Sequence, residues 1–199
     1  EYHFAVSEIK KRVLDINKNS ACEMIWLLEH NSIFTAGTSA KLEDLKNSNV
    51  NFQYTGRGGQ WTWHGPGQRV VYLMLNLNNR LQDVKAYIYA LEELIILTLK
   101  DFHIDGLRIN GQPGVWIKDN NGCNKIAALG IRISSWITFH GISINVNPNL
   151  DEFNNIVPCG IKNSGVTSFY KLGKKISIKE LDISLKKNFN KVFGNESLF

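Results

Sequence analysis

The chain has 199 residues, of which 43% are hydrophobic, 21% are charged and 11% are aromatic. This composition is typical of a globular protein and excludes an intrinsically disordered chain, and the length predicts a single domain over residues 1–199. The net charge of +5 favours acidic partners. The longest apolar cluster, residues 91–99, is too short and carries too many glutamates to span a membrane.

Hydrophobic periodicity divides the chain into helices and strands. Apolar residues recur at helical spacing over 2–16 and 84–102, and Asp83 is the expected N-cap of the second helix. A capping box at 177–180 begins a third helix, which Gly194 ends. Strands are predicted at 24–29, 33–37, 51–55, 69–77, 115–118, 125–133 and 140–146. Because hairpin turns outnumber strict strand–helix alternation, we expect an α/β fold of the α+β type, with a mixed β-sheet packed by helices.

A glycine-rich segment, GRGGQWTWHGPGQ, covers residues 56–68. Its five glycines and one proline predict a loop rather than a helix or a regular strand. The segment has neither the Gly-Lys-Ser/Thr of a P-loop nor a dinucleotide-binding fingerprint that opens a helix. Its two tryptophans suit an apolar ligand or single-stranded nucleic acid, and the plainer interpretation is a long loop with two aromatic side chains buried beneath it.

The three cysteines, Cys22, Cys123 and Cys159, show no paired spacing. Their odd number argues against a disulfide framework and against zinc, and it predicts a reducing compartment, with the cytoplasm as the simplest setting. Cys22 begins an apolar strand and is expected in the core, whereas Cys123 lies in a polar turn and is expected at the surface. Cys159 stands between proline and glycine in a rigid turn that suits a nucleophile, although a lone cysteine is more often a small buried hydrophobe.

Lys125 begins the apolar run KIAALGIRI. Its side chain either extends outward to solvent or faces a pocket, where burial would make it a usable base. Among the histidines, His64 and His140 each precede a glycine and are candidates for a base or a positioning group. The other three, His3, His30 and His103, are expected at the surface. No pair of histidines has the spacing of a metal site, so no metal is predicted.

Five motifs appear in a fixed order and together resemble one family. They are RGGQWTWHGPGQ at 57–68, GVW at 114–116, KIAALGIR at 125–132, FHGISINV at 139–146, and IVPCGI at 156–161 with GVTS at 165–168. In this order they resemble the octanoyltransferases, or lipoyl(octanoyl) transferases, of lipoate biosynthesis. The resemblance extends from about residue 26 to residue 168. It implies the α/β fold of the biotin and lipoate protein ligase catalytic domains, with a strand missing before Glu1.

The resemblance also implies a site. The acyl-accepting thiol of the family falls on Cys159 and its partner amine on Lys125. The implied substrate-binding residues are Arg57, Gly58, Gly59, Gln60, Trp61, Thr62, Trp63, His64, Ala128, Leu129, Gly130, Gly141, Ile142 and Ser143. Trp61 and Trp63 depart from the family, in which smaller side chains or tyrosine are common at these positions. Because of this departure, the resemblance does not fix the length of acyl chain that the site prefers.

The implied reaction moves an octanoyl group from octanoyl-acyl carrier protein to the ε-amine of a lysine. The acceptors are lipoyl domains of 2-oxoacid dehydrogenase complexes and the glycine cleavage H protein, and no cofactor, nucleic acid or membrane takes part. A lysine amine has a pKa of ~10.4 and is charged at neutral pH, so a cysteine thioester would divide the transfer into two easier steps. In its ammonium form, Lys125 would favour the thiolate of Cys159. In its neutral amine form, it would take the proton that the acceptor lysine loses.

Three alternatives remain open from the sequence. An ATP-dependent lipoate or biotin ligase would share the fold but would not need a nucleophilic cysteine. A nucleic-acid reader would account for the basic charge and the tryptophans, although the charge is scattered rather than gathered in a stripe. Within the acyltransferase interpretation, Cys159 would pair with His64 or His140 instead of Lys125.

Overall fold

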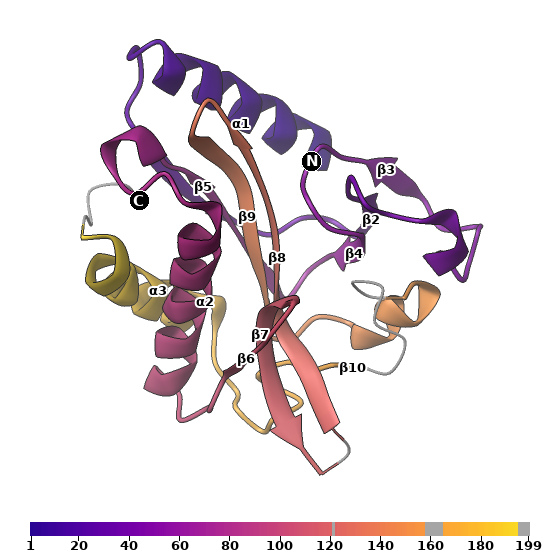
Figure 1. Ribbon diagram of the computed structural model, residues 1–199. Helices are drawn as coiled ribbons and strands as arrows, with labels where there is room; N and C mark the ends of the chain where they lie inside the picture. The colour runs from indigo at the N-terminus through magenta and orange to yellow at the C-terminus, as the bar shows by residue number, and fades with distance from the viewer. Residues whose placement is uncertain (121, 158–164, 195–199) are drawn as a thin grey trace.

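The computed structural model describes residues 1–120, 122–157 and 165–194, and Figure 1 shows a long twisted sheet with helices on both of its faces. In chain order the elements are α1 (Tyr2–Asn17), β1 (Met24–Leu28), β2 (Ile33–Ala36), η1 (Leu42–Asp44), β3 (Phe52–Tyr54), β4 (Trp61–His64), β5 (Gln68–Met74), η2 (Leu77–Asn79), α2 (Val84–Asp101), β6 (Leu107–Ile109), β7 (Gln112–Asp119), β8 (Gly122–Ser134), β9 (Ile137–Asn145), η3 (Leu150–Asn155), β10 (Gly165–Val166) and α3 (Ile178–Phe193). The expected mixed sheet packed by helices is confirmed.

Two sheets form the framework of the described residues. The larger has the order β1-β5-β9-β8-β7-β6, with β10 added in parallel to β8 and every other pairing antiparallel. The smaller has the order β3-β2-β4, where β2 pairs with β3 in parallel and with β4 antiparallel. The glycine-rich segment therefore connects the two sheets, because β4 belongs to the smaller sheet and β5 begins at Gln68 in the larger one.

Helices cover both faces of the larger sheet. One face packs against α1, whose buried residues follow the expected helical spacing: Tyr2, Ala5, Ile9, Val13 and Ile16. The other face packs against α2 and α3. Strand β5 serves both layers, since Val70 and Tyr72 face α1 while Val71 and Leu73 face the other pair of helices. Burial on both faces explains why β5 reads as a nearly continuous apolar run.

The helix ends confirm the predicted signals. Asp83 caps α2, and its carboxylate accepts from the backbone N–H groups of Lys85 (2.8 Å) and Ala86 (3.1 Å). Ser177 and Glu180 form the capping box of α3. At the other end of α3, Gly194 adopts a left-handed conformation with φ of 76°.

The glycine-rich segment holds one element that the sequence did not predict. Residues 61–64 form the regular strand β4, which pairs with β2, so the expectation of an irregular loop over all of 56–68 was wrong. The five glycines lie at 56, 58, 59, 65 and 67. None lies inside 61–64, where two tryptophans and a threonine have high strand propensity.

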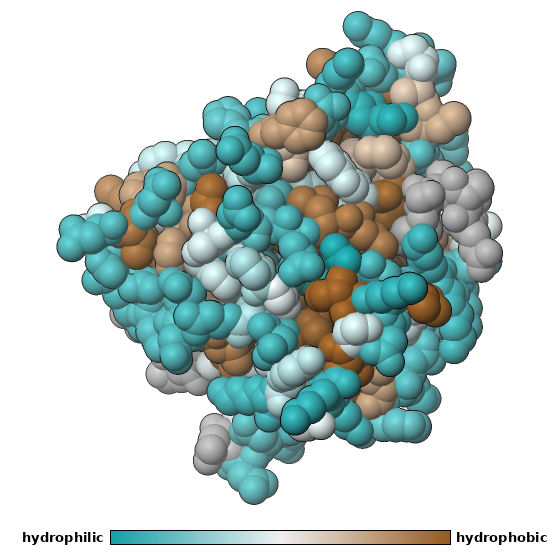
Figure 2. Space-filling model, turned by 180° about the vertical axis from the view of Figure 1, so that it is seen from behind, coloured by the Kyte–Doolittle hydropathy of each residue, from teal (hydrophilic) through white to brown (hydrophobic). Residues whose placement is uncertain are grey.

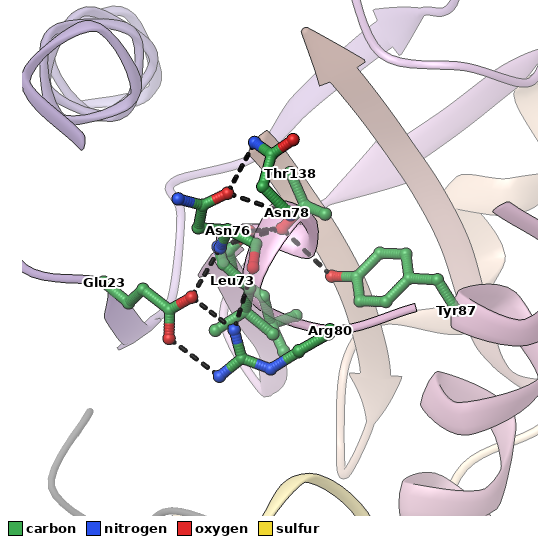
Figure 3. A network of polar contacts seen from close by, with 8 residues as sticks. Glu23, Leu73, Asn76, Asn78, Arg80, Tyr87 and Thr138 are labelled. Carbon is green, nitrogen blue, oxygen red and sulfur yellow. Dashed lines mark hydrogen bonds and ion pairs between the residues drawn. The ribbon is translucent and has the colours of Figure 1, made fainter. Parts of the chain in front are cut away.

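Polar contacts fix the end of the sheet near the β8–β9 turn. Figure 3 shows Glu23 paired with Arg80, while the same carboxylate accepts from the backbone N–H of Asn76 (2.6 Å). The hydroxyl of Thr138 donates to a β5 carbonyl (2.8 Å) and accepts from the hydroxyl of Tyr87 (3.3 Å). The first pair of contacts joins the residues that flank β1 and η2, and the second joins β9 to β5 and α2.

No helix in the described ranges is long and apolar enough to cross a membrane. Figure 2 shows that the rear face is mostly hydrophilic, with hydrophobic side chains gathered in a band through its middle.

Candidate active site

A cavity of about 290 Å³ lies between the glycine-rich segment and strands β8 and β9. Its wall combines apolar side chains from β5, β8 and β9 with polar and basic ones from the glycine-rich segment. The lining residues are Tyr2, Ser39, Arg57, Gly59, Gln60, Trp61, Thr62, His64, Val70, Tyr72, Gly111, Gln112, Pro113, Lys125, Ala128, Leu129, Gly130, His140, Gly141, Ile142 and Ser143. An apolar cavity with a few convergent polar groups is the usual form of a small-molecule site.

A β-bulge in β8 turns Lys125 toward this cavity. Trp116 on β7 pairs with Lys125, but the preceding residue of β7 pairs with Ala127, so Ile126 is an extra residue on β8. Ile126 and Ala127 both pack into the core beneath α2 and α3. Because both point the same way, Lys125 and Ala128 on either side of them both line the cavity.

The Lys125 side chain is held along its whole length. It is 6% exposed, and its Nζ donates to the carbonyl of Pro113 (3.0 Å) and lies 4.5 Å from the centre of the Trp116 ring. Gly114, with φ of 125°, leaves room for the stem, because a Cβ there would lie 3.1 Å from Cε of Lys125 and 2.7 Å from the carbonyl of Ala127. A cation held in this way has one orientation, with its amine at the cavity edge.

Arg57 ties the glycine-rich segment to β2. Its Nη2 donates to the carbonyl (2.8 Å) and hydroxyl (2.9 Å) of Thr35 and to the carbonyl of Gln60 (2.8 Å), and its Nη1 donates to the carbonyl of Gly58 (3.0 Å). Gly130 lies against it, since a Cβ at that position would be 2.9 Å from Cδ of Arg57. The guanidinium therefore shapes the cavity wall and also places a positive charge beside it.

Aromatic and imidazole rings cluster at one part of the cavity. The His30 ring lies 4.9 Å from Tyr2 and 5.8 Å from His64, centre to centre, and its Nε2 is 2.7 Å from the hydroxyl of Tyr72. His140 lies 6.0 Å from Tyr72. The expectation of a surface position for His30 was wrong: it is 4% exposed, because β5 and the start of α1 cover it.

The three clustered histidines are neutral at physiological pH. Burial is the main cause, and it lowers the pKa of His30 to about 4, of His64 to about 3 and of His140 to about 4. The charge of Arg57 further lowers the pKa of His64 and of His140. No group of three or more metal-ligating side chains occurs in the part of the chain that the structure describes.

A chain of side-chain amides connects His64 to the other side of the cavity. Nδ1 of His64 is 2.7 Å from Oε1 of Gln68. The Gln68 amide donates to Oδ1 of Asn145 (3.0 Å), and the Asn145 amide donates to the carbonyl of Thr167 (3.0 Å). The backbone N–H of Thr167 in turn donates to the carbonyl of Lys125 (3.0 Å). A second cavity of about 20 Å³ lies against Gln68, Asn145 and Lys125.

The sequence reasoning missed Gln68 and Asn145. Gln68 closes the motif HGPGQ and Asn145 lies in FHGISINV, so each stood inside a motif already singled out. Both are nearly fully buried, at 1% and 5% exposed. A buried amide needs hydrogen-bonding partners, but the sequence alone does not show that these two are buried or that they meet.

Most of the expected site residues come together in the structure. Lys125 lines the cavity with twelve of the implied substrate-binding residues: Arg57, Gly59, Gln60, Trp61, Thr62, His64, Ala128, Leu129, Gly130, Gly141, Ile142 and Ser143. Gly58 and Trp63 are not among the lining residues. The Trp63 indole turns away, donates to the hydroxyl of Ser32 (2.9 Å) and packs edge-on against Phe153.

The cysteines differ from expectation in two places. Cys159 lies outside the described residues. Cys22 is exposed, so the expectation of a core position was wrong, because β1 begins two residues later at Met24. Cys123 was expected at the surface and is half-buried, since it lies within β8 opposite Lys118.

Comparisons with known proteins agree with this fold and show the family of the chain. The family model described as the lipoyl protein ligase A/B catalytic domain matches residues 2–190. An octanoyltransferase from Bartonella tribocorum is 50% identical over 204 residues, which cover 98% of this chain and 83% of the relative. The bi-partite lipoate protein ligase from Thermoplasma acidophilum has a TM-score of 0.70 at 13% identity, covering 92% of this chain and 77% of that one. Biotin protein ligase from Aquifex aeolicus has a TM-score of 0.52 at 20% identity, covering 80% and 68%. The chain therefore belongs to the lipoyl protein ligase A/B catalytic domain family, in its octanoyltransferase branch of acyltransferases.

Proposed function

We propose that this chain transfers an octanoyl group from octanoyl-acyl carrier protein to the ε-amine of a lysine on a lipoyl domain. The group passes through a thioester on Cys159, and the transfer takes place in the cytoplasm. The printed name of the Bartonella relative supports octanoyl transfer. A lipoyl acceptor is supported by the archaeal lipoate protein ligase, which is described together with its E2 lipoyl domain.

The observation that carries the proposal is the placement of Lys125. The bulge at Ile126 turns this lysine into the cavity, and Pro113 and Trp116 hold its amine there. Val166 pairs with Lys125 in the parallel β10–β8 ladder. The chain that follows Cys159 in the sequence therefore rejoins the sheet at Lys125, as a cysteine–lysine pair would require.

In the first step, the Cys159 thiolate attacks the carbonyl carbon of the carrier thioester. A new C–S bond forms to Cys159, the C–S bond to the carrier breaks, and the leaving thiolate takes a proton from the Lys125 ammonium. The products are S-octanoyl Cys159, the free carrier thiol and neutral Lys125. A nearby ammonium also favours the attacking thiolate.

In the second step, the neutral acceptor amine attacks the same carbonyl carbon. A C–N bond forms and the bond to Cys159 breaks. Neutral Lys125 takes the proton that the acceptor nitrogen loses, so the thiolate–ammonium pair is restored for the next cycle. The amide product is more stable than the thioester, which makes this step favourable.

The cavity offers an apolar wall for the acyl chain. Val70, Leu129 and Ile142 line it together with Trp61. Burial at ~0.8 kcal/mol per methylene gives roughly 5 kcal/mol for the whole acyl chain. The net charge of +5 favours acidic acyl carrier and lipoyl domains, and we expect both encounters to weaken with salt.

The proposal is tested by the intact mass of the protein after incubation with octanoyl-acyl carrier protein, without ATP. We expect the mass of one octanoyl group, located on Cys159 by peptide mapping and removed by hydroxylamine. Cys22→Ala and Cys123→Ala are the matched controls and should still be acylated. An unmodified wild-type protein, or acylation that persists in Cys159→Ala, contradicts the thioester mechanism, and a requirement for ATP would favour a ligase.

A further inference from the structure

Backbone carbonyl groups fix which atom donates and which accepts in the row of side-chain amides between His64 and Thr167. A backbone carbonyl only accepts, so Asn145 must turn its NH₂ group toward Thr167 and its oxygen toward Gln68. Gln68 contacts the carbonyl of Trp63 (3.3 Å) as well as that oxygen. It must therefore turn its NH₂ group toward these two acceptors and its own oxygen toward His64.

The proton on the His64 ring follows from this direction. The Gln68 oxygen is 2.7 Å from Nδ1 of His64 and only accepts, so Nδ1 carries the proton. Nε2 then has a free lone pair. Among the described residues the ring makes its side-chain hydrogen bond through Nδ1, and His64 lines the cavity. Nε2 is therefore the ring nitrogen left to accept from a molecule bound there.

We infer that Gln68 and Asn145 are positioning residues that hold His64 as the Nδ1–H tautomer, so that Nε2 accepts a hydrogen bond from a substrate N–H. The ring stays neutral near pH 7, because burial lowers the pKa of His64 to about 3. An imidazole with such a pKa is a poor base at neutral pH but remains a hydrogen-bond acceptor. Its role in the cavity is therefore to orient a substrate rather than to remove its proton.

The identity of the substrate group that offers the N–H rests on the proposed function. An octanoyl chain has no N–H, but two other parts of the substrates have one: the amides of the pantetheine arm of the donor and the amine of the acceptor lysine. Both present the same chemistry to Nε2. They enter in different half-reactions, so kinetics can separate them.

The tautomer can be observed directly by NMR of protein labelled with ¹⁵N-histidine. We expect the His64 proton on Nδ1 near neutral pH in the wild type, and mixed tautomers in Gln68→Leu. Asn188→Ala is the matched control, because Asn188 is fully buried in α3 and bonds Asp101 and Ser184. It should destabilise the fold but leave the His64 signals unchanged. A wild-type proton on Nε2 would overturn the inference, whatever the outcome for Cys159.

A second variant tests the consequence for the reaction. In Gln68→Glu a carboxylate beside Nδ1 raises the pKa of His64 by about 1–3, so Nε2 gains a proton and stops accepting at mildly acidic pH, where the wild-type ring is still neutral. We expect kcat/KM of this variant, relative to the wild type, to fall about tenfold as the pH is lowered from 7 toward 5, which is the loss expected for one hydrogen bond, and to recover as the pH rises. Single-turnover acylation and transfer assays show which half-reaction uses Nε2.

Asn188→Ala should keep the wild-type pH profile, because a loss of stability alone does not move it. If Gln68→Glu also keeps that profile in both half-reactions, the inference is wrong. If Cys159 is not acylated but His64 carries its proton on Nδ1, the proposed function is rejected and the assignment of the tautomer stands.

Discussion

Lys125 and Ile126 are neighbours in β8, yet their side chains point to opposite faces of the sheet, while Ile126 and Ala127 share one face. Regular strand alternation would place Lys125 on the core side with Ala127. One extra residue in β8 reverses this order. The position of the cavity amine therefore depends on a local irregularity of the backbone as much as on the lysine itself.

Gly114 is the first position at which this arrangement can be tested. A methyl group there would lie 2.7 Å from the Ala127 carbonyl and 3.1 Å from Cε of Lys125, at a φ of 125°. We expect Gly114→Ala to lower stability by about 1–3 kcal/mol and to slow acylation of Cys159 by about tenfold or more, measured by quenched-flow mass spectrometry.

Gly122→Ala is the matched control for Gly114→Ala. Gly122 has a φ of 130°, but a methyl group there meets nothing within 4 Å. This variant should share the backbone strain without the effect on acylation. Equal acylation rates in the two variants would show that Gly114 does not position Lys125.

Lys125 itself is tested by Lys125→Met, which keeps an unbranched stem and removes the proton donor. Loss of a general acid–base group costs about 10²–10⁴ in rate, and we expect this loss in both half-reactions of a single-turnover assay. Lys118→Met, an exposed lysine on the adjacent strand, should leave both rates unchanged. If Lys125→Met acylates normally and His64→Ala does not, the cysteine pairs with the histidine instead.

Much of the framework could be predicted from local patterns. The α1 face, the Asp83 cap and the Ser177–Glu180 capping box each depend on residues within one or two turns of each other, and all three are present. The family resemblance also implied that residues of the glycine-rich segment, β8 and β9 share one substrate-binding site, and these segments line one cavity.

Other features depend on contacts between distant parts of the chain. The run KIAALGIRI is continuously apolar from Ile126 to Leu129, without alternation, so it gives no sign of the bulge. His30 follows a strand and precedes polar residues, which is typical of a surface turn. It is buried because Tyr2 and Tyr72, from two other elements, pack around it. The Gln68–Asn145 contact joins residues 77 positions apart.

The buried histidines predict how stability depends on pH. Their pKa values in the folded state, about 4 for His30 and His140 and about 3 for His64, lie below the ordinary value of 6.5. The unfolded chain therefore binds more protons below pH 6.5, and the folded state loses stability as the pH falls from 6.5 toward 4. Each such proton contributes about 1.4 kcal/mol per pH unit. Urea denaturation between pH 7 and pH 4.5 should show this decline.

A single replacement isolates one of these histidines. His140→Gln removes one titrating group, so the decline in unfolding free energy below pH 6.5 should become less steep than in the wild type. His103→Gln is the control, because His103 is exposed, and it should leave the slope unchanged. A wild-type free energy of unfolding that stays constant over this range would contradict burial of neutral imidazoles.

The two tryptophans of β4 should affect chain length differently. Trp61 lines the cavity, whereas Trp63 packs against Phe153 behind it. Trp61→Val opens space for a longer acyl chain, and two extra buried methylenes are worth ~1.6 kcal/mol. We therefore expect the ratio of decanoyl to octanoyl transfer to rise by about tenfold in competition assays with the two acyl carrier proteins. Trp63→Val removes as much aromatic volume from the same strand, and it should lower the melting temperature while leaving this ratio at the wild-type value. If both variants change the ratio equally, the selectivity arises from the stability of β4 rather than from the cavity wall.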